Sequence, residues 1–194
     1  MPPKPFYRPV TPFIINQLFG ENSACVSLDG SNKIIVCDGN NPPSGYKSLY
    51  GSGGHRGLDL DAKRGQPIYC ALGGHVDFID TQPKSGLDVR IISTVNGVRY
   101  MHIYEHLLGH NSMKLKQNVK TGECIGWADN TGWSAGNHLH LEIKKETPNG
   151  WKPIDPLSMM NEEFALNANT AYVILLERLA VAMEKLVDIL RRKK

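Results

Sequence analysis

The sequence shows no readable pattern of a segment that would carry a protein into or across a membrane. Its first ten residues, MPPKPFYRPV, contain no apolar stretch of the kind that a secretory signal needs, so we expect no signal peptide. The longest apolar stretch, at 171–183, is interrupted by Glu177 and Arg178, so we expect no membrane span. No basic run is interleaved with aromatic residues, which argues against a nucleic-acid partner. The formal net charge of +3 suits either a solvated surface or an anionic partner such as a bacterial wall.

Cysteine is scarce, and the four cysteines fit neither a zinc knuckle nor a CxxC redox pair. Cys25 and Cys37 lie equidistant from Ser31 in ACVSLDGSNKIIVC, a pattern that predicts a hairpin with its turn at DGSN. A cross-strand disulfide and two separate buried thiols are both compatible with this hairpin. Cys70 and Cys124 stand in apolar strand patterns, and we expect both in the core.

Glycine and proline, by contrast, are plentiful and separate short stretches rich in Val, Ile and Tyr. Short strands punctuated by Gly and Asn favour antiparallel sheets, so we predict a mainly β fold. We find no internal repeat in the chain. Seven strand candidates follow one another between residues 51 and 158: GLDLDA, PIYCAL, HVDFID, DVRIISTV, VRYMHIYEHL, ECIGWAD and HLHLEIK.

Three regions differ in composition along the chain. Residues 1–50 form a proline-rich arm and the hairpin, and residues 51–158 form the body. Residues 161–194 contain neither Gly nor Pro and predict an amphipathic C-terminal α-helix. Its apolar residues recur at alternating spacings of four and three from Tyr172 to Leu190, a heptad-like pattern. We expect this helix to mediate a homo-oligomer or to bind a partner protein; the alternative is that its wide apolar stripe packs back onto the β body.

Two histidines stand two residues apart in GNHLHLEIK, directly at the start of an alternating pattern. A strand sends residues i and i+2 to the same face, so His138, His140 and Glu142 share one face. The apolar residues between them, from Leu139 to Ile143, share the other face and are expected in the core.

A second polar pair occurs in GGHRGLDLD, where the glycines disfavour a helix. In an extended conformation His55, Gly57 and Asp59 share a face, and Gly57 leaves room for a close approach to the backbone. His55 and Asp59, joined by a His from a distant strand, would make a three-ligand set with an open fourth position, as catalytic zinc requires. Exposed strand residues, or an Asp that caps a turn, are the alternative.

A third polar element is VRYMHIYEHLLG, in which alternation predicts one face shared by Val98, Tyr100, His102, Tyr104 and His106. At the rise of a strand, His102 lies roughly 13 Å from His106, which is too far for both to bind one metal ion.

With these motifs in this order, the stretch from Gly51 to Ile143 resembles the lysostaphin-type (LytM-type) zinc metallopeptidases, a family of peptidoglycan endopeptidases. His55 and Asp59 match the HxxxD motif of that family, and YEHL matches its YxHL motif. The final motif, TGxSxGxHLHxE, is matched by TGWSAGNHLHLE. Asn137 and Leu141 depart from residues that the family often has, and neither supplies a ligand.

The resemblance implies the fold, the site and the reaction. The fold would be the antiparallel β-sheet groove of these peptidases, also described as a duplicated hybrid motif. His55, Asp59 and His140 would bind one Zn²⁺ per chain, with a zinc-bound water as the nucleophile. His106 and His138 would be the catalytic histidines, without assignment of which one acts as the base. The expected reaction is hydrolysis of the peptide cross-links of bacterial peptidoglycan.

Two other functions are open from the sequence. One is a catalytically inactive wall-binding or virion structural module, against which the five intact positions argue. The other is a zinc D-alanyl carboxypeptidase, a class that needs a different ligand spacing. The absence of a readable signal peptide, and of a repeated wall-binding module, leads us to expect a phage-encoded or virion-associated lytic enzyme that acts on the cell wall.

Overall fold

The computed structural model describes residues 6–19, 26–28, 34–36 and 55–159. Within these residues the regular structure is β-strand, apart from one short 3-10 helix, η2 (Pro156–Met159). The prediction of a mainly β, antiparallel fold is confirmed, because every strand pair is antiparallel. The helix expected at 161–194 lies outside the described residues, as do Cys25 and Cys37.

Each of the seven strand candidates overlaps a strand of the structure, and further short strands join them. In chain order the strands are β1 (Ile15–Gln17), β2 (Val26–Leu28), β3 (Ile34–Val36), β4 (Gly57–Asp61), β5 (Pro67–Tyr69), β6 (Gly74–Gln82), β7 (Gly86–Val95), β8 (Val98–His110), β9 (Asn118–Val119), β10 (Cys124–Ala128), β11 (His138–Thr147) and β12 (Gly150–Ile154).

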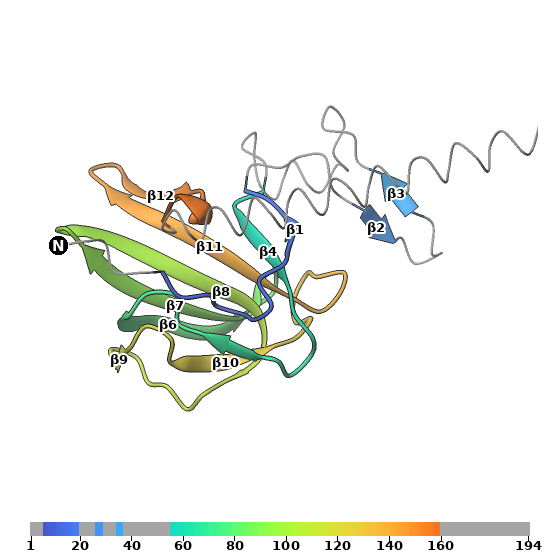
Figure 1. The fold of residues 1–194 in the computed structure, drawn as a ribbon, viewed down its shortest axis with the longest axis horizontal. Coiled ribbons are helices and arrows are strands. Elements are labelled where there is room, and N and C mark those ends of the chain that lie inside the picture. The colour runs from blue at the N-terminus through green and yellow to red at the C-terminus, as the bar shows by residue number, and fades with distance from the viewer. Residues whose placement is uncertain (1–5, 20–25, 29–33, 37–54, 160–194) are drawn as a thin grey trace, which may run out of the picture.

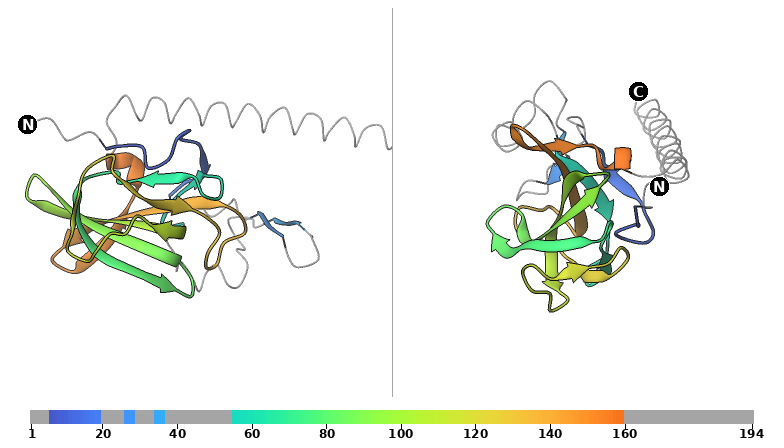
Figure 2. Two further views of the ribbon diagram at one scale, coloured as in Figure 1. Left: turned by 90° about the horizontal axis from the view of Figure 1, so that it is seen from below. Right: turned by 90° about the vertical axis from the view of Figure 1, so that its left-hand side faces the viewer.

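The main sheet has the order β1-β4-β11-β8-β7-β6-β9, with β12 beside β11 and β10 joining β5 to β8 (Figure 1). Its organising strand is β8, which is 13 residues long. The first part of β8 pairs with β7 and β11, and its last residues pair with β10. The end-on view in Figure 2 shows the strands curving around an interior. The hairpin predicted near the N-terminus is present as the antiparallel pair of β2 and β3.

The hydrophobic core lies on one face of the curved sheet. Leu139, Leu141 and Ile143 of β11 are fully buried in it, as the alternation of GNHLHLEIK predicts. Cys70 is also buried, whereas Cys124 is only half-buried. In the part of the chain that the structure describes, no helix has the length and the apolar character needed to cross a bilayer.

The proline-rich arm shares this core. Phe6 and Val10 are buried among the side chains of the sheet. The backbone N–H of Tyr7 donates a hydrogen bond of 2.7 Å to the carbonyl of Ala71, and β1 pairs with β4. Residues 6–18 therefore form part of the same packed unit as the strands from β4 onwards.

The face predicted for VRYMHIYEHLLG is correct for His102 and Tyr104 and wrong for His106. His102 is fully buried and stacks on Phe6, with ring centroids 5.8 Å apart. The Tyr104 hydroxyl accepts a hydrogen bond of 2.8 Å from the backbone N–H of Ala71. Both side chains therefore belong to the core, whereas the His106 side chain lies on the opposite face, near the other site histidines.

The buried His102 ring predicts a loss of stability in acid. Among the described residues neither ring nitrogen has a hydrogen-bond partner, and burial lowers the pKa of His102 from 6.5 to about 4. The unfolded chain therefore binds a proton at a higher pH than the folded chain does. This group's contribution to the free energy of unfolding should fall between pH 6.5 and pH 4, by on the order of 3 kcal/mol.

Urea unfolding of the metal-free protein at pH 7.5 and pH 4.5 measures this effect. His102→Phe should reduce the difference between the two pH values, whereas the control His75→Phe, at a less buried position of β6, should keep it. An equal pH dependence in His102→Phe and the wild type would contradict the assignment.

Candidate metal centre

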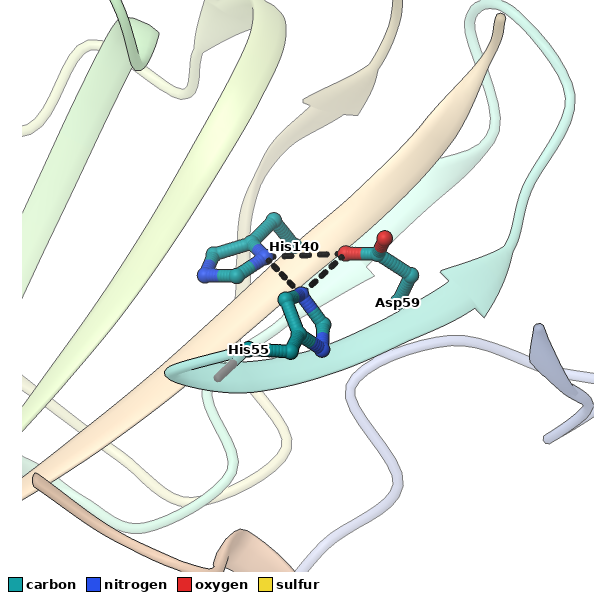
Figure 3. Close-up of side chains that lie close together, drawn as sticks. All are labelled: His55, Asp59 and His140. Atoms are coloured by element: carbon teal, nitrogen blue, oxygen red, sulfur yellow. Dashed lines mark hydrogen bonds and ion pairs between the residues drawn. The ribbon is translucent and has the colours of Figure 1, made fainter. Parts of the chain in front are cut away.

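The pairing of β4 with β11 places the first polar cluster. In this register Asp59 stands directly opposite His140, and Gly57 stands opposite Glu142. His55 lies just before the start of β4, and its side chain reaches back toward the same point (Figure 3). Two motifs that are 81 residues apart in the chain, HxxxD and HLH, thus meet across one strand pair.

Three ligand atoms converge in this cluster. Nε2 of His55 lies 3.2 Å from Oδ1 of Asp59 and 3.1 Å from Nδ1 of His140. Nδ1 of His140 lies 2.8 Å from the same Asp59 oxygen. His55 and His140 are buried, and Asp59 is half-buried. The atoms form a compact triangle of two nitrogens and one oxygen (Figure 3).

This triangle fits a small divalent ion. Zinc–ligand distances of about 2.0–2.2 Å in a tetrahedron place neighbouring ligand atoms about 3.3 Å apart, so the triangle would expand by only about 0.1–0.5 Å. The ring of His55 is also oriented for this purpose, because its Nδ1–H donates a hydrogen bond of 3.0 Å to the carbonyl of Leu18. That bond occupies Nδ1 and leaves Nε2 directed at the cluster, as the outer partners of metal-binding histidines do.

The cluster brings the carboxylate of Asp59 together with several histidine rings, and these groups shift one another's pKa values. Burial would raise the pKa of Asp59, but hydrogen bonds with His138, His140 and His55 hold it far below its usual range. Burial would lower the pKa of His140, but the Asp59 carboxylate, with Glu105 and Glu142 nearby, raises it to about 9. The negative charge of Asp59 is thus balanced by histidine protons in a place where a dication would also balance it.

His138 lies at the edge of the same cluster. Its Nε2 is 3.5 Å from Oδ1 of Asp59, and its Nδ1–H donates a hydrogen bond of 2.8 Å to the carbonyl of Gly136. Burial would lower the pKa of His138, but the hydrogen bond with Asp59 and the negative charge of that carboxylate raise the pKa. His138 is therefore close to the cluster without belonging to the triangle of His55, Asp59 and His140.

His106 reaches the site through a β-bulge. The pairing of β8 with β7 slips by one residue between the pairs Tyr104–Val89 and Leu107–Leu87, and His106 has a φ of 65°. An extra residue in one strand re-aims the side chains around it. The bulge therefore turns His106 out of the core face, and its ring centroid lies 4.8 Å from that of His138.

The environment of His106 differs from that of His138. Burial, together with the neighbouring His138, lowers the pKa of His106 to about 4. Its Nδ1–H donates a hydrogen bond of 2.7 Å to the carbonyl of Thr131. His106 is therefore a neutral imidazole, with Nε2 as the nitrogen able to accept a proton.

A cavity of about 200 Å³ opens beside these histidines. Sequence reasoning did not identify most of the residues that line it. Glu105, for example, faces the site because it pairs directly with His140, and only the strand register reveals that pairing. Exposed Trp133 stands in the loop before β11. The cavity is lined by Arg56, Lys84, Ser85, Glu105, His106, Trp133, His140 and Glu142.

Residues 53–156, more than half of the chain, match Peptidase family M23. The chain belongs to peptidase family M23. Members of this family are metal-dependent peptidases, so the resemblance found in the sequence motifs is confirmed. The cluster of His55, Asp59 and His140 is accordingly the candidate metal site of an M23 metallopeptidase.

Three known proteins are similar to this chain in sequence or in fold. The peptidoglycan DD-endopeptidase ShyA of Vibrio cholerae is 36% identical over 89 residues, which are 46% of this chain and 20% of the relative. The chain thus spans about a fifth of the length of that relative. A zinc-containing peptidase from Vibrio cholerae has a TM-score of 0.52 at 25% identity, covering 82% of this chain and 40% of the other. Lysostaphin from Staphylococcus simulans shares the fold, with a TM-score of 0.57 at 20% identity, over 81% of this chain and 55% of the other.

Gly57 provides a test of the strand pairing that builds the cluster. A Cβ at this position would lie 2.3 Å from the Leu141 carbonyl oxygen and 2.9 Å from Nε2 of His140. Gly57→Ala should push β11 away from β4, lower the free energy of unfolding by roughly 1–3 kcal/mol and weaken metal binding by at least about tenfold. Metal-competition titration and thermal unfolding measure the two effects.

Gly109→Ala is the matched control, because a Cβ there would meet only the Trp127 ring, at 3.8 Å. This control should keep both properties of the wild type. Wild-type metal affinity in Gly57→Ala would show that the close approach of the two strands does not shape the cluster.

Proposed function

We propose that this chain is a zinc-dependent metalloendopeptidase that hydrolyses peptide cross-links of bacterial peptidoglycan. The observation that carries the proposal is the convergence of the ligand atoms of His55, Asp59 and His140 within 2.8–3.2 Å of one another, beside two further histidines, in a member of peptidase family M23.

Zinc is the metal that this ligand set favours. The two imidazole nitrogens are borderline ligands that suit zinc, and zinc also accepts a carboxylate oxygen, whereas calcium and magnesium prefer sites made of oxygen alone. Three protein ligands leave a fourth position open, which distinguishes catalytic from structural zinc sites. The similar peptidase from Vibrio cholerae contains zinc, which supports the same assignment for this chain. When bound, zinc would supply a Lewis acid and lower the pKa of a coordinated water toward 7.

His106 and His138 are proposed to move protons during the reaction. Their ring centroids are 4.8 Å apart, and both rings lie beside the metal ligands. Each Nδ1–H is bound to a backbone carbonyl, of Thr131 for His106 and of Gly136 for His138. Each ring thus offers its Nε2 for accepting a proton from the attacking water or for donating one to the leaving amine.

The substrate is proposed from the family and from the cavity. The similar protein ShyA of Vibrio cholerae is named as a peptidoglycan DD-endopeptidase, which supports peptidoglycan as the substrate. The lining of the cavity carries charges of both signs, from Arg56 and Lys84 and from Glu105 and Glu142, and exposed Trp133 adds an aromatic surface. Such a lining suits a short polar peptide better than an apolar ligand.

Substitution of the histidines separates metal binding from proton transfer. His140→Ala should lose zinc and activity together, because three protein ligands leave none to spare. His106→Ala and His138→Ala should keep one zinc per chain while turnover falls by roughly 10²- to 10⁴-fold, the usual range for a lost acid–base group. Elemental analysis after dialysis gives the zinc content, and digestion of purified peptidoglycan gives the turnover.

One outcome would reverse the proposed roles of His138 and His140, which are proton transfer and metal binding. If His138→Ala lost zinc while His140→Ala retained it with wild-type affinity, the two histidines would have to exchange their functions.

Product analysis tests the reaction itself. Purified peptidoglycan incubated with the zinc-loaded protein should yield a fall in cross-linked muropeptides and a rise in new peptide amino termini, and His140→Ala should yield neither. Release of free D-alanine alone would instead identify a carboxypeptidase. The absence of any product, with zinc bound at full stoichiometry, would identify an inactive module.

A further inference from the structure

We propose that Thr131 is a positioning residue for His106: it holds the loop before β11 against the bulge of β8, so that a backbone carbonyl fixes the tautomer of the histidine. This inference rests on the proposed function only for its kinetic consequence. Thr131 itself lies on the far side of the His106 ring from Nε2, since it binds Nδ1, and it is absent from the lining of the cavity.

The tautomer follows from the bond between the two residues. Nδ1 of His106 lies 2.7 Å from the carbonyl oxygen of Thr131. A carbonyl oxygen can only accept, so Nδ1 must carry the hydrogen, and in the neutral ring Nε2 is then the unprotonated nitrogen. His106 lines the cavity, and its Nδ1 is occupied by this bond, so Nε2 is the nitrogen available for chemistry.

The side chain of Thr131 holds that carbonyl in place. Its hydroxyl donates a hydrogen bond of 2.9 Å to the carbonyl of Leu107, the residue that follows His106. The same hydroxyl accepts a hydrogen bond of 3.1 Å from the backbone N–H of Leu87 at the start of β7. One hydroxyl thus connects the loop to both strands that form the bulge, using its donor and its acceptor at once.

The backbone around Thr131 is built for this close approach. Gly86 and Gly132 both have positive φ, of 64° and 77°. A Cβ on Gly86 would lie 2.2 Å from the Thr131 hydroxyl oxygen, and a Cβ on Gly132 would lie 2.3 Å from the backbone nitrogen of Gly86. The turn between β6 and β7 therefore packs directly on Thr131, without side chains between them.

The loop before β11 also provides a backbone carbonyl that accepts a hydrogen bond from the second histidine, His138. Nδ1–H of His138 donates to the carbonyl of Gly136 at 2.8 Å, and the hydroxyl of Ser134 donates to that carbonyl at 2.8 Å as well. The loop thus supplies one carbonyl to each of the two histidines. For His106, however, the anchoring hydroxyl binds two neighbouring strands, so its loss should have the larger effect.

Thr131→Val tests the proposal, because valine keeps the shape of threonine and removes both hydrogen bonds of its hydroxyl. We expect zinc content and KM to stay at wild-type values while kcat falls roughly 10- to 100-fold, since a displaced catalytic group costs this much. Thr131→Ser keeps the hydroxyl and should remain within about threefold of the wild type. Thr147→Val is the matched control, because among the described residues its hydroxyl bonds the carbonyl of Gly150, the first residue of β12, and reaches neither β7 nor β8.

A double-mutant cycle separates positioning from general destabilisation. In a His106→Ala background, Thr131→Val should cause no further loss of kcat, because the group it positions is absent. An equal loss in both backgrounds, or an equal loss in Thr131→Ser and Thr131→Val, would overturn the proposal.

A direct reading of the tautomer does not depend on activity. Nitrogen-15 NMR of the zinc-loaded protein, with the His106 signal assigned by comparison with His106→Ala, should show hydrogen on Nδ1 only, and Thr131→Val should populate both tautomers. An unchanged tautomer in Thr131→Val would overturn this inference and leave the proposed peptidase unaffected. A wild type that shows this tautomer but cleaves no peptidoglycan would refute only the proposed function.

Discussion

The antiparallel register of β4 on β11 is the constraint on which the site depends. Asp59 meets His140 because these residues are direct partners in the ladder, and His55 reaches them from just before the same strand. A slip of one residue in a strand pair exchanges the two faces of a strand, so the buried Leu139 and Leu141 fix the register as firmly as any polar contact does. The packing of the core and the geometry of the candidate metal ligands are thus set by the same pairing.

A second constraint comes from the backbone carbonyls that orient the imidazole rings. Leu18, Thr131 and Gly136 each accept a hydrogen bond from the Nδ1–H of a site histidine. Each of these hydrogen bonds occupies Nδ1 of a histidine ring. The position of the main chain therefore determines that Nε2 is the nitrogen available to bind a metal ion or to exchange a proton. The carboxylate of Asp59 is the exception, since it contacts His55, His138 and His140 directly.

Much of this arrangement could be read from the sequence, and the rest has no local signal. The spacing of two in HLH and of four in HxxxD predicts shared faces, and the structure brings His55, Asp59 and His140 together as those spacings indicate. The alternation rule fails at His106, because a bulge with positive φ is unusual for a non-glycine residue and nothing in the local sequence marks it. Glu105 was missed for a related reason, since its position opposite His140 follows from a register between strands far apart in the chain.

The oriented carbonyls were also beyond sequence reasoning, because every residue has a carbonyl and its role depends only on where the backbone passes. The arm illustrates this most clearly. Composition alone separates it from the body as a proline-rich extension, yet Phe6 and Val10 complete the core, and Leu18 orients the ring of His55. Short segments that contribute to the fold through a few buried side chains and backbone contacts have weak sequence patterns. Long strands that alternate between apolar and polar residues have strong ones.

The contribution of the arm limits how modular this peptidase can be. The stretch that matches family M23 begins at residue 53, but the acceptor for His55 and two apolar side chains of the interior come from residues 6–18. A graft of the matched stretch onto another scaffold would therefore transfer all five candidate site residues and leave behind the carbonyl that orients the ring of His55. In protein engineering, the transferable unit is a set of segments held together by packing, and its boundaries are those of the core and not those of the family motif.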